Sequence, residues 1–176
     1  MVLIFEPLNV ALIAGDLGME GVNLLRVVVT AARDSPANHD QRNQNEITLA
    51  VRDRQTDTFI GTTGLYSVNW IMRTAEFRVF LGNKTFWNRG IGTESTKLMV
   101  VYGFEKMNLN RIWLGVNTEN IGGVHAYEKA GFAKEGILRQ EQYRNFRYYD
   151  VIRMSILRCE YEKIREGYIQ VEHNGS

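Results

Sequence analysis

The chain has 176 residues and a single cysteine, and this scarcity excludes one class of protein at once. A single thiol cannot close a disulfide within the chain, so the fold is not that of a disulfide-stapled secreted domain. The composition instead fits a reducing cytoplasm. Cys159 has no histidine near it in the sequence. We therefore expect Cys159 to be a buried small side chain rather than a nucleophile.

The chain also lacks an excess of charge of either sign, with 21 basic residues against 20 acidic ones. Proteins that bind nucleic acid or anionic membranes carry a basic patch or stripe, which this balance does not provide. Residues 144–149 (RNFRYY) interleave bases with aromatics, but their length and alternation favour a strand over an RNA-binding surface. We expect neither nucleic acid nor a membrane as a partner.

Long hydrophobic runs are missing as well. The apolar segment 10–32 is interrupted by Asp16, Glu20, Arg26 and three glycines, so it does not span a bilayer comfortably. The N-terminus lacks the basic opening and small-residue cleavage site of a signal peptide. We expect a cytoplasmic protein with a short strand at 3–5 and a helix or helix pair within 10–32.

The chain has only three histidines, His39, His125 and His173, and their spacing is not that of metal ligands. No metal site is therefore expected. The remaining composition, with 44% hydrophobic residues, can bury one sizeable core. Because no repeat or linker interrupts it, the whole chain 1–176 is predicted to form a single domain.

The most informative pattern present is residues 86–94 (FWNRGIGTE), between a strand-like segment at 75–81 and a helix-like one at 94–107. Gly90 and Gly92 leave main-chain N–H groups uncovered at the positive end of a helix dipole, where phosphate or pyrophosphate binds. The lysine of a Walker A loop is missing, and Ser95 stands in place of the third glycine of a dinucleotide fingerprint. This turn predicts a phosphate-bearing cofactor without saying which one.

A second pattern, residues 120–132 (NIGGVHAYEKAGF), narrows the choice. Together the two patterns resemble the acyl-CoA-binding core of the GNAT acetyltransferase superfamily, in the branch of spermidine and ribosomal-protein N-terminal acetyltransferases. The family pattern is a strand, then R/Q-x-x-G-x-G/A, a helix, a strand, then Asn, a short helix with Tyr, and Gly-Phe. Its order and spacing hold from about 47 to 161. Trp87 departs from it, since many members carry Gln or Arg there.

The resemblance and the hydrophobic periodicity predict an α+β fold, a mixed and mostly antiparallel sheet flanked by helices. Asn120 is a plausible N-cap and Gly131 a left-handed C-cap of one helix. Gly61 and Gly64 suggest a bulge or a close backbone approach within their strand. Strands are expected at 47–51, 59–68, 75–81, 111–116, 133–142 and 148–157, with helices at 94–107 and 160–167 and polar turns or loops at 35–45, 52–57 and 69–73.

In the family, the amine attacks the thioester of acetyl-CoA directly, without an acyl-enzyme. The amine must be neutral, and deprotonating one of pKa roughly 10.4 at pH 7 costs about 4.6 kcal/mol. The resemblance assigns Tyr127 to the leaving thiolate, as a hydrogen-bond donor and late proton donor. The alternative is a core tyrosine, because Val124 shares its helix face. Glu76 is the candidate base, direct or through water; the alternative is a solvated strand carboxylate.

The resemblance also implies the contacts to acetyl-CoA. Phe80 and Leu81 would offer main-chain groups to the pantetheine, with their side chains in the core. Asn120 would lie near the pantetheine arm, and an N-cap role is compatible with this. The residues implied for the pyrophosphate are Arg89, Gly90, Ile91, Gly92 and Thr93.

The sequence thus predicts an acetyl-CoA-dependent N-acetyltransferase acting on a small primary amine or a protein N-terminus. A non-catalytic acyl-CoA-binding or sensing domain with the same fold remains an alternative. A nucleotide-binding module that uses Gly90 and Gly92 is a third, but it leaves residues 120–132 unexplained. No motif identifies the acceptor, and a homodimer remains open.

Overall fold

The structure is a computed structural model, and it describes residues 27–31 and 45–169 of the chain. The elements of this part are the strands β1 (Val27–Ala31), β2 (Ile47–Asp53), β3 (Phe59–Asn69), β4 (Thr74–Leu81), β5 (Arg111–Asn117), β6 (Ala133–Arg144) and β7 (Arg147–Leu157), the helices α2 (Ile91–Val101), α3 (Ile121–Lys129) and α4 (Arg158–Ile169), a short 3₁₀ turn η1 (Lys84–Phe86) and a π-helical turn η2 (Tyr102–Lys106).

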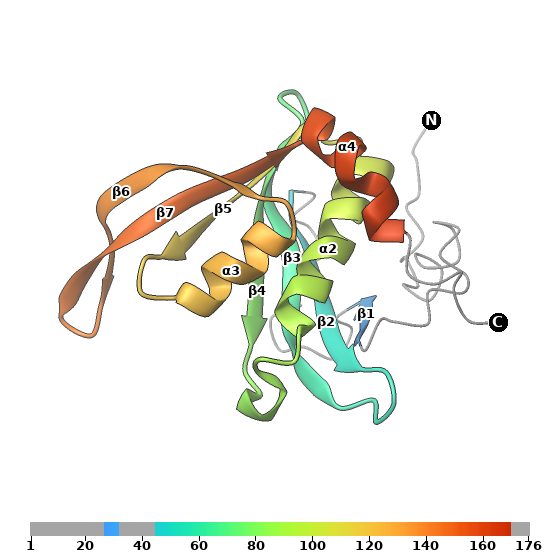
Figure 1. Cartoon of the computed structure of the whole chain (residues 1–176), viewed down its shortest axis with the longest axis horizontal. Helices are drawn as coiled ribbons and strands as arrows, with labels where there is room; N and C mark the ends of the chain where they lie inside the picture. Colours follow the sequence, from blue (N-terminus) through green and yellow to red (C-terminus); the bar gives the residue numbers. More distant parts are fainter. Residues whose placement is uncertain (1–26, 32–44, 170–176) are drawn as a thin grey trace.

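The described strands form one sheet in the order β1-β2-β3-β4-β5-β7-β6. Every neighbouring pair is antiparallel except β4 and β5, which run parallel. Helices α2, α3 and α4 lie on one side of this sheet, and the β6–β7 hairpin projects away from the rest (Figure 1). The predicted α+β fold with a mixed, mostly antiparallel sheet is therefore confirmed. Each strand predicted from 47 onward overlaps an observed one.

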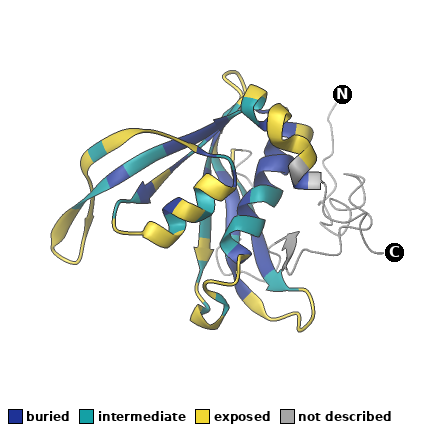
Figure 2. Ribbon diagram, viewed as in Figure 1, coloured by how far each residue is buried: buried dark blue, intermediate teal, exposed yellow. Residues whose placement is uncertain are grey.

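The core joins buried residues of the central strands and of α2, which are coloured dark blue in Figure 2. Leu65, Phe77 and Ile112 from the centre of the sheet meet Met99 of α2 there, all at most 2% exposed. A second, smaller cluster joins Val51, Ile60 and Ile91. Burying a side chain such as Ile91 contributes about 2 kcal/mol, so this cluster fixes the first residue of α2 on β2 and β3.

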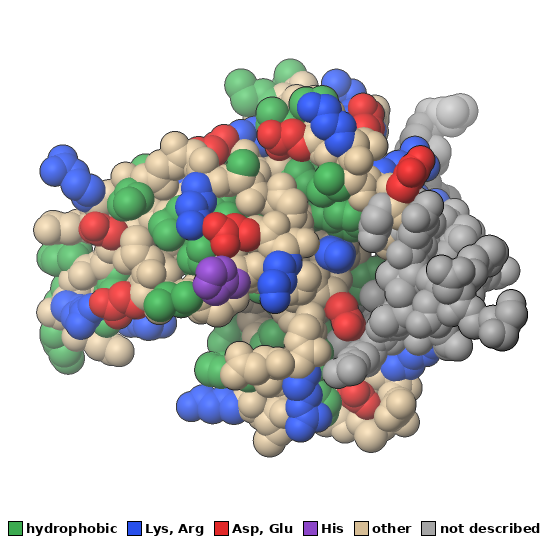
Figure 3. All heavy atoms as spheres, viewed as in Figure 1, with side chains coloured by type: hydrophobic (Ala, Val, Ile, Leu, Met, Phe, Trp, Pro, Cys, Tyr) green, Lys and Arg blue, Asp and Glu red, His purple; other side chains and the backbone are tan. Residues whose placement is uncertain are grey.

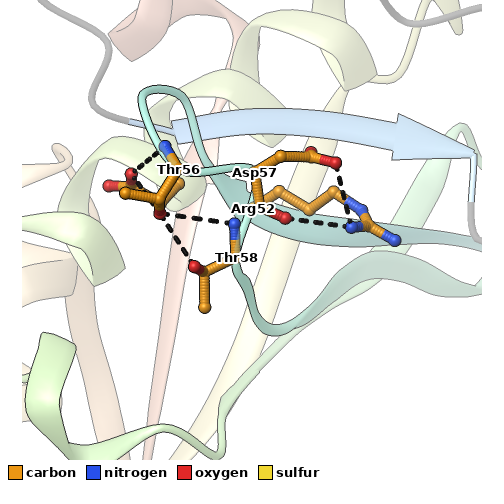
Figure 4. A network of polar contacts seen from close by, with 5 residues as sticks. Arg52, Thr56, Asp57 and Thr58 are labelled. Atoms are coloured by element: carbon orange, nitrogen blue, oxygen red, sulfur yellow. Dashed lines mark hydrogen bonds and ion pairs between the residues drawn. The ribbon is translucent and has the colours of Figure 1, made fainter.

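The turn between β2 and β3 is held by its own polar side chains. The Arg52 guanidinium donates to the Asp57 main-chain oxygen over 3.0 Å, and the hydroxyls of Thr56 and Thr58 are 2.8 Å apart (Figure 4). Asp53 accepts from the Thr56 hydroxyl and N–H, and these bonds lower the pKa of its carboxyl. The predicted polar turn is confirmed, but Arg52 and Asp53 still belong to the strand.

Several expectations need correction. Residues 27–31 form a strand rather than helix, because a β-branched run (VVVTA) favours an extended chain and can pair along the β2 edge. The rest of segment 10–26, the predicted strand at 3–5, residues 35–44 of the predicted loop and the tail 171–176 lie outside the described residues. The helix predicted from 94 begins at Ile91, three residues earlier, and continues into η2.

Two further corrections concern single side chains near the C-terminal strands. Cys159 is exposed rather than buried, at the start of α4. Asn145 and Phe146 form the two-residue turn between β6 and β7, with φ of 52° and 60°, instead of continuing a strand. No helix among the described residues is long and apolar enough to cross a membrane.

Candidate functional site

The central feature of the sheet is an opening between its two parallel strands. β4 and β5 pair only where Thr74–Glu76 lie beside Arg111–Trp113. Beyond this point residues 77–81 pair with β3 alone, and residues 114–117 with β7 alone. The arrowheads of β4 and β5 point apart (Figure 1). Two strand edges therefore face each other without sharing hydrogen bonds, and their main-chain groups can bind an extended ligand between them.

The main-chain groups that face this opening follow from strand alternation. On the β3 side, Gly82 N–H donates to Ile60 O over 3.1 Å, and the Thr63 hydroxyl donates to Arg78 O. Even-numbered residues of β4 thus turn toward β3. The odd-numbered residues Val79 and Leu81 therefore turn their N–H and C=O groups to the opening.

Phe80 departs from what the sequence suggested. Its main-chain oxygen points at β3, where a Cβ added to Gly61 would lie 1.9 Å from it. Its side chain is 70% exposed instead of forming part of the core, because it shares the outer face of β4 with Arg78. The Leu81 side chain does pack against the cluster around Ile91, as expected.

The glycine turn opens α2 as predicted. Gly90 is the N-cap, with φ 84° and ψ −7°, and no side chain caps this end of the helix. A Cβ on Gly92 would meet only Leu81 Cδ1, at 3.8 Å, so space is left above this residue. Ile91 is buried and offers only main-chain groups. The first-turn N–H groups therefore point out of the fold beside the end of β4, as a phosphate site requires.

Trp87 ties this turn to the strand, a contact that the sequence did not reveal. Its indole Nε1–H donates to Leu81 O over 2.9 Å, while half of the side chain stays exposed. Two cations lie near: the Lys84 ammonium is 5.8 Å from the Trp87 ring, and the Arg89 guanidinium is 5.5 Å from the Phe86 ring. Trp87 departs from the family pattern, and it holds the loop against the end of β4 through its hydrogen bond to a main-chain oxygen.

Tyr127 lies on α3, which crosses in front of the opening (Figure 1). Its ring packs edge-on against Phe77 of β4, with 6.1 Å between centroids, and 6.2 Å from Phe132. Burial raises the pKa of its hydroxyl to about 12. Among the described residues no hydrogen-bond partner reaches that hydroxyl. Tyr127 is therefore part of the core through its ring and holds an unused donor through its oxygen.

The ends of the Tyr127 helix follow the predicted capping. The Asn120 side chain accepts from Gly123 N–H over 3.0 Å, which confirms the N-cap. Gly131, just beyond the C-cap, has φ 79°, as a left-handed C-terminal glycine requires. These caps fix the position of Tyr127 along the opening.

Glu76 occupies the last position at which β4 pairs with β5. Since Phe77 points to Tyr127, the adjacent Glu76 side chain points to the opposite face of the sheet. Its side chain is 18% exposed, and both carboxylate oxygens accept from Arg78, over 2.9 and 2.8 Å. Glu76 is thus an ion-paired and partly buried carboxylate, and its role as the base stays a prediction. Tyr127 and Glu76 approach the opening from two faces, and sequence reasoning missed the arginine.

The charges on the helix-bearing face of the site are mixed. On the helix-bearing face, acidic and basic side chains are interspersed (Figure 3). Within the described part of the chain, no three His, Cys, Asp or Glu side chains are grouped to hold a metal ion.

Comparisons with known proteins agree on one family. Residues 27–133 match the family model of the acetyltransferase (GNAT) domain. A spermidine N(1)-acetyltransferase of Vibrio cholerae is 37% identical over 113 residues, which cover 64% of each chain. One from Escherichia coli is 36% identical over 57% of this chain and 54% of its own. A putative ribosomal N-acetyltransferase of Bacillus subtilis is 29% identical, over 58% and 55%.

The solved structures that the chain resembles are also acetyltransferases. A spermidine N-acetyltransferase from Vibrio cholerae in complex with CoA and spermine superposes with a TM-score of 0.64 and 36% identity, over 69% of this chain and 70% of that one. The chain thus spans only 64% and 54% of the length of the first two curated relatives that it matches.

Proposed function

Because the chain belongs to the GNAT acetyltransferase family, we propose that it transfers an acetyl group from acetyl-CoA to a primary amine, on a small molecule or a peptide N-terminus. The observation that carries the proposal is the opening between β4 and β5, which leads directly to the glycine-capped start of α2. An extended amide chain and a pyrophosphate are the two parts of CoA that such an arrangement suits.

The fit to acetyl-CoA rests on four features of the chain. Val79 through its N–H and C=O, and Leu81 through its N–H, offer main-chain groups to the pantetheine amides along the open edge of β4, while Leu81 O is bound by Trp87. The first turn of α2, with Gly92 uncovered, receives the pyrophosphate, and Asn120 borders the pantetheine arm from the start of α3. Tyr127 supplies a donor that no described residue uses. Acetyl-CoA supplies the activated acyl group and a thiolate leaving group.

The proposed chemistry divides between the two faces. From the outer face, the Glu76 carboxylate accepts a proton from the amine, directly or through water, so that the nitrogen lone pair can attack. From the helix face, the Tyr127 hydroxyl donates a hydrogen bond to the departing sulfur. At a pKa of about 12, full transfer to a thiolate of pKa about 8.5 is uphill by roughly 5 kcal/mol. Tyr127 therefore acts mainly by hydrogen bonding.

The direct test is release of free thiol from acetyl-CoA with purified protein and a panel of primary amines. We expect release that depends on the amine, and an acetylated amine by mass spectrometry. Saturable CoA binding without thiol release for any amine would support the second candidate, a non-catalytic acyl-CoA-binding domain. One observation favours that candidate: Arg78 already engages both oxygens of Glu76.

The role of Glu76 predicts a change in the pH profile. Glu76→Gln should slow acetylation most at low pH, where the amine is almost entirely protonated and depends on the base. As pH rises toward the pKa of the amine, solution supplies neutral amine and the deficit should shrink. Rates from pH 6.5 to 9.5 with one good acceptor measure this. Glu128→Gln, on the exposed side of α3, is the control. A deficit that stays constant with pH would remove Glu76 from the mechanism.

Trp87 predicts a selective loss of affinity. Trp87→Phe keeps a ring but removes the bond to Leu81 O, worth about 1 kcal/mol or roughly fivefold in affinity. We expect weaker binding of CoA, whose pyrophosphate needs the turn in place, and unchanged binding of pantetheine, which lacks it. Calorimetry measures both. Trp70→Phe, equally exposed at 50%, is the matched control. Equal losses for both ligands would show that the bond does not position the turn.

A further inference from the structure

The outer face of the sheet carries a row of side chains that the mechanism uses only in part. Tyr66 of β3 is opposite Glu76 of β4, and Glu76 is in register with Trp113 of β5. Residues in register on neighbouring strands point to the same face. Glu76 therefore lies between two aromatic residues, at the point where β4 and β5 part. Since Tyr127 occupies the helix side, an amine that attacks through the opening arrives over this row.

An arginine lies over each aromatic ring of the row. The Arg78 guanidinium is 4.9 Å from the Tyr66 ring centroid, and the Arg153 guanidinium is 4.1 Å from that of Trp113. The Tyr66 ring is itself fixed, because its hydroxyl accepts from the Thr48 hydroxyl over 2.9 Å. These contacts hold Arg78 in place beside Glu76.

Gly64 makes this arrangement possible. A Cβ at Gly64 would lie 2.9 Å from Tyr66 Cε2 and 2.2 Å from Ile47 O. Only glycine therefore leaves room for the Tyr66 ring and for the main chain of β2 beside this part of β3. The close backbone approach expected from the sequence at this position is confirmed, and it serves the side chains that surround Glu76.

Arg78 keeps donors to spare. A guanidinium has five N–H groups, and Glu76 takes two of them, one on Nε and one on Nη2, which leaves three. The side chain is 58% exposed, and none of these three N–H groups has a described acceptor. Glu46 also acts on Arg78 electrostatically, although it makes no hydrogen bond to it among the described contacts. The outer face thus presents, side by side, a carboxylate and the free end of a guanidinium.

We propose that the acceptor is a primary amine that also carries a carboxylate, with its amine at Glu76 and its carboxylate on the free N–H groups of Arg78. The proposal rests on the proposed function and narrows its substrate class to amino acids and acidic peptides. A planar guanidinium pairs with a carboxylate through two parallel bonds. The second ammonium of a diamine or polyamine would instead meet the positive charge of Arg78.

The reaction itself balances as for any amine. The nitrogen forms a bond to the acetyl carbon, the carbon–sulfur bond breaks, and the sulfur keeps the electron pair and leaves as a thiolate. The ammonium gives up two protons through Glu76 or water; one goes to solvent, and the thiolate takes up the equivalent of the other to become CoA thiol. The carboxylate is not consumed, so the product is an N-acetylated acid.

The test uses a series of acceptors H₃N–(CH₂)n–X in which X is carboxylate, methyl or ammonium at each chain length. We expect the wild-type kcat/KM for the best carboxylate to exceed that of the matched diamine at least about tenfold. Arg78→Gln should bring this ratio close to one, and Arg78→Lys should restore part of it. Both acceptors are measured with the same variant, so a general loss of rate caused by a disturbed Glu76 cancels in the ratio. Arg54→Gln, in the exposed β2–β3 turn, should leave the ratio unchanged.

Binding separates this proposal from the proposed function. Calorimetric titration of the protein with the same carboxylates and diamines, without acetyl-CoA, does not depend on turnover. If no amine releases thiol, the acetyltransferase assignment fails, and the binding preference alone then decides the present proposal. A preference for diamines, or a carboxylate preference that Arg78→Gln leaves unchanged, would overturn it.

Discussion

Tyr127→Phe should lower kcat by roughly 10²- to 10⁴-fold, the usual loss for a missing proton or hydrogen-bond donor in the transition state. CoA affinity should be unchanged, because the hydroxyl meets the sulfur only as it departs. Stability should stay the same or rise. The ring contacts with Phe77 and Phe132 remain in the variant, and the deleted hydroxyl has no partner among the described residues. Single-turnover rates, calorimetry and thermal melting measure the three quantities.

Tyr161→Phe is the matched control for this variant, with the opposite signature. The Tyr161 hydroxyl donates to Glu105 over 3.0 Å, away from the opening, and the residue is 1% exposed. Its loss should reduce stability by about 1 kcal/mol and leave kcat intact. A Tyr127→Phe enzyme with wild-type kcat would return Tyr127 to a purely structural role in the core.

The raised pKa of Tyr127 determines the protonation state of its hydroxyl over the pH range of an assay. Burial disfavours the phenolate, so the hydroxyl remains protonated up to about pH 12. The donor is therefore present throughout an assay from pH 6.5 to 9.5. Any fall in rate on the alkaline side of that range has to come from another group.

Gly92→Val should weaken CoA binding more than tenfold, or about 1.4 kcal/mol, without unfolding the protein. An added Cβ meets only Leu81 Cδ1, at the ordinary contact distance of 3.8 Å, so the protein itself has room for it. A pyrophosphate on the first turn of α2 would not have that room. Gly90 is unsuitable for this test, because its φ of 84° strains any other residue.

Gly136→Val provides the control for Gly92, since a Cβ at Gly136 meets nothing within 4 Å and β6 lies away from the glycine turn. Both variants should melt close to the wild type, and only Gly92→Val should lose affinity. If a folded Gly92→Val binds CoA as tightly as the wild type, the pyrophosphate is not at this turn.

The features of the site that could be predicted are formed by residues that are close together in the sequence. A strand, two glycines and a helix follow one another within 75–101, so periodicity and turn chemistry identify them. The caps Asn120 and Gly131 were predictable for the same reason. The error over the start of α2 came from Gly90, which serves as the N-cap in a left-handed conformation and lets the helix begin at Ile91.

The parts that sequence reasoning missed depend on contacts between strands. Whether Val79 or Phe80 faces the opening is decided by the β3–β4 register, which no local pattern gives. Arg78 reaches Glu76 because both lie on the outer face of β4, two residues apart. The strand at 27–31 is visible only once β2 is known to offer it an edge.

The central claim is that the opening between β4 and β5 and the first turn of α2 together bind acyl-CoA. Backbone amide NMR during titration with CoA tests it most directly, because it reports each N–H separately. We expect the largest shifts at Val79, Leu81 and the amides of 91–93, and small ones at Phe80 and Gly82, which face β3. Saturable binding that leaves 79, 81 and 91–93 unshifted, with the changes elsewhere on the protein, would contradict the account.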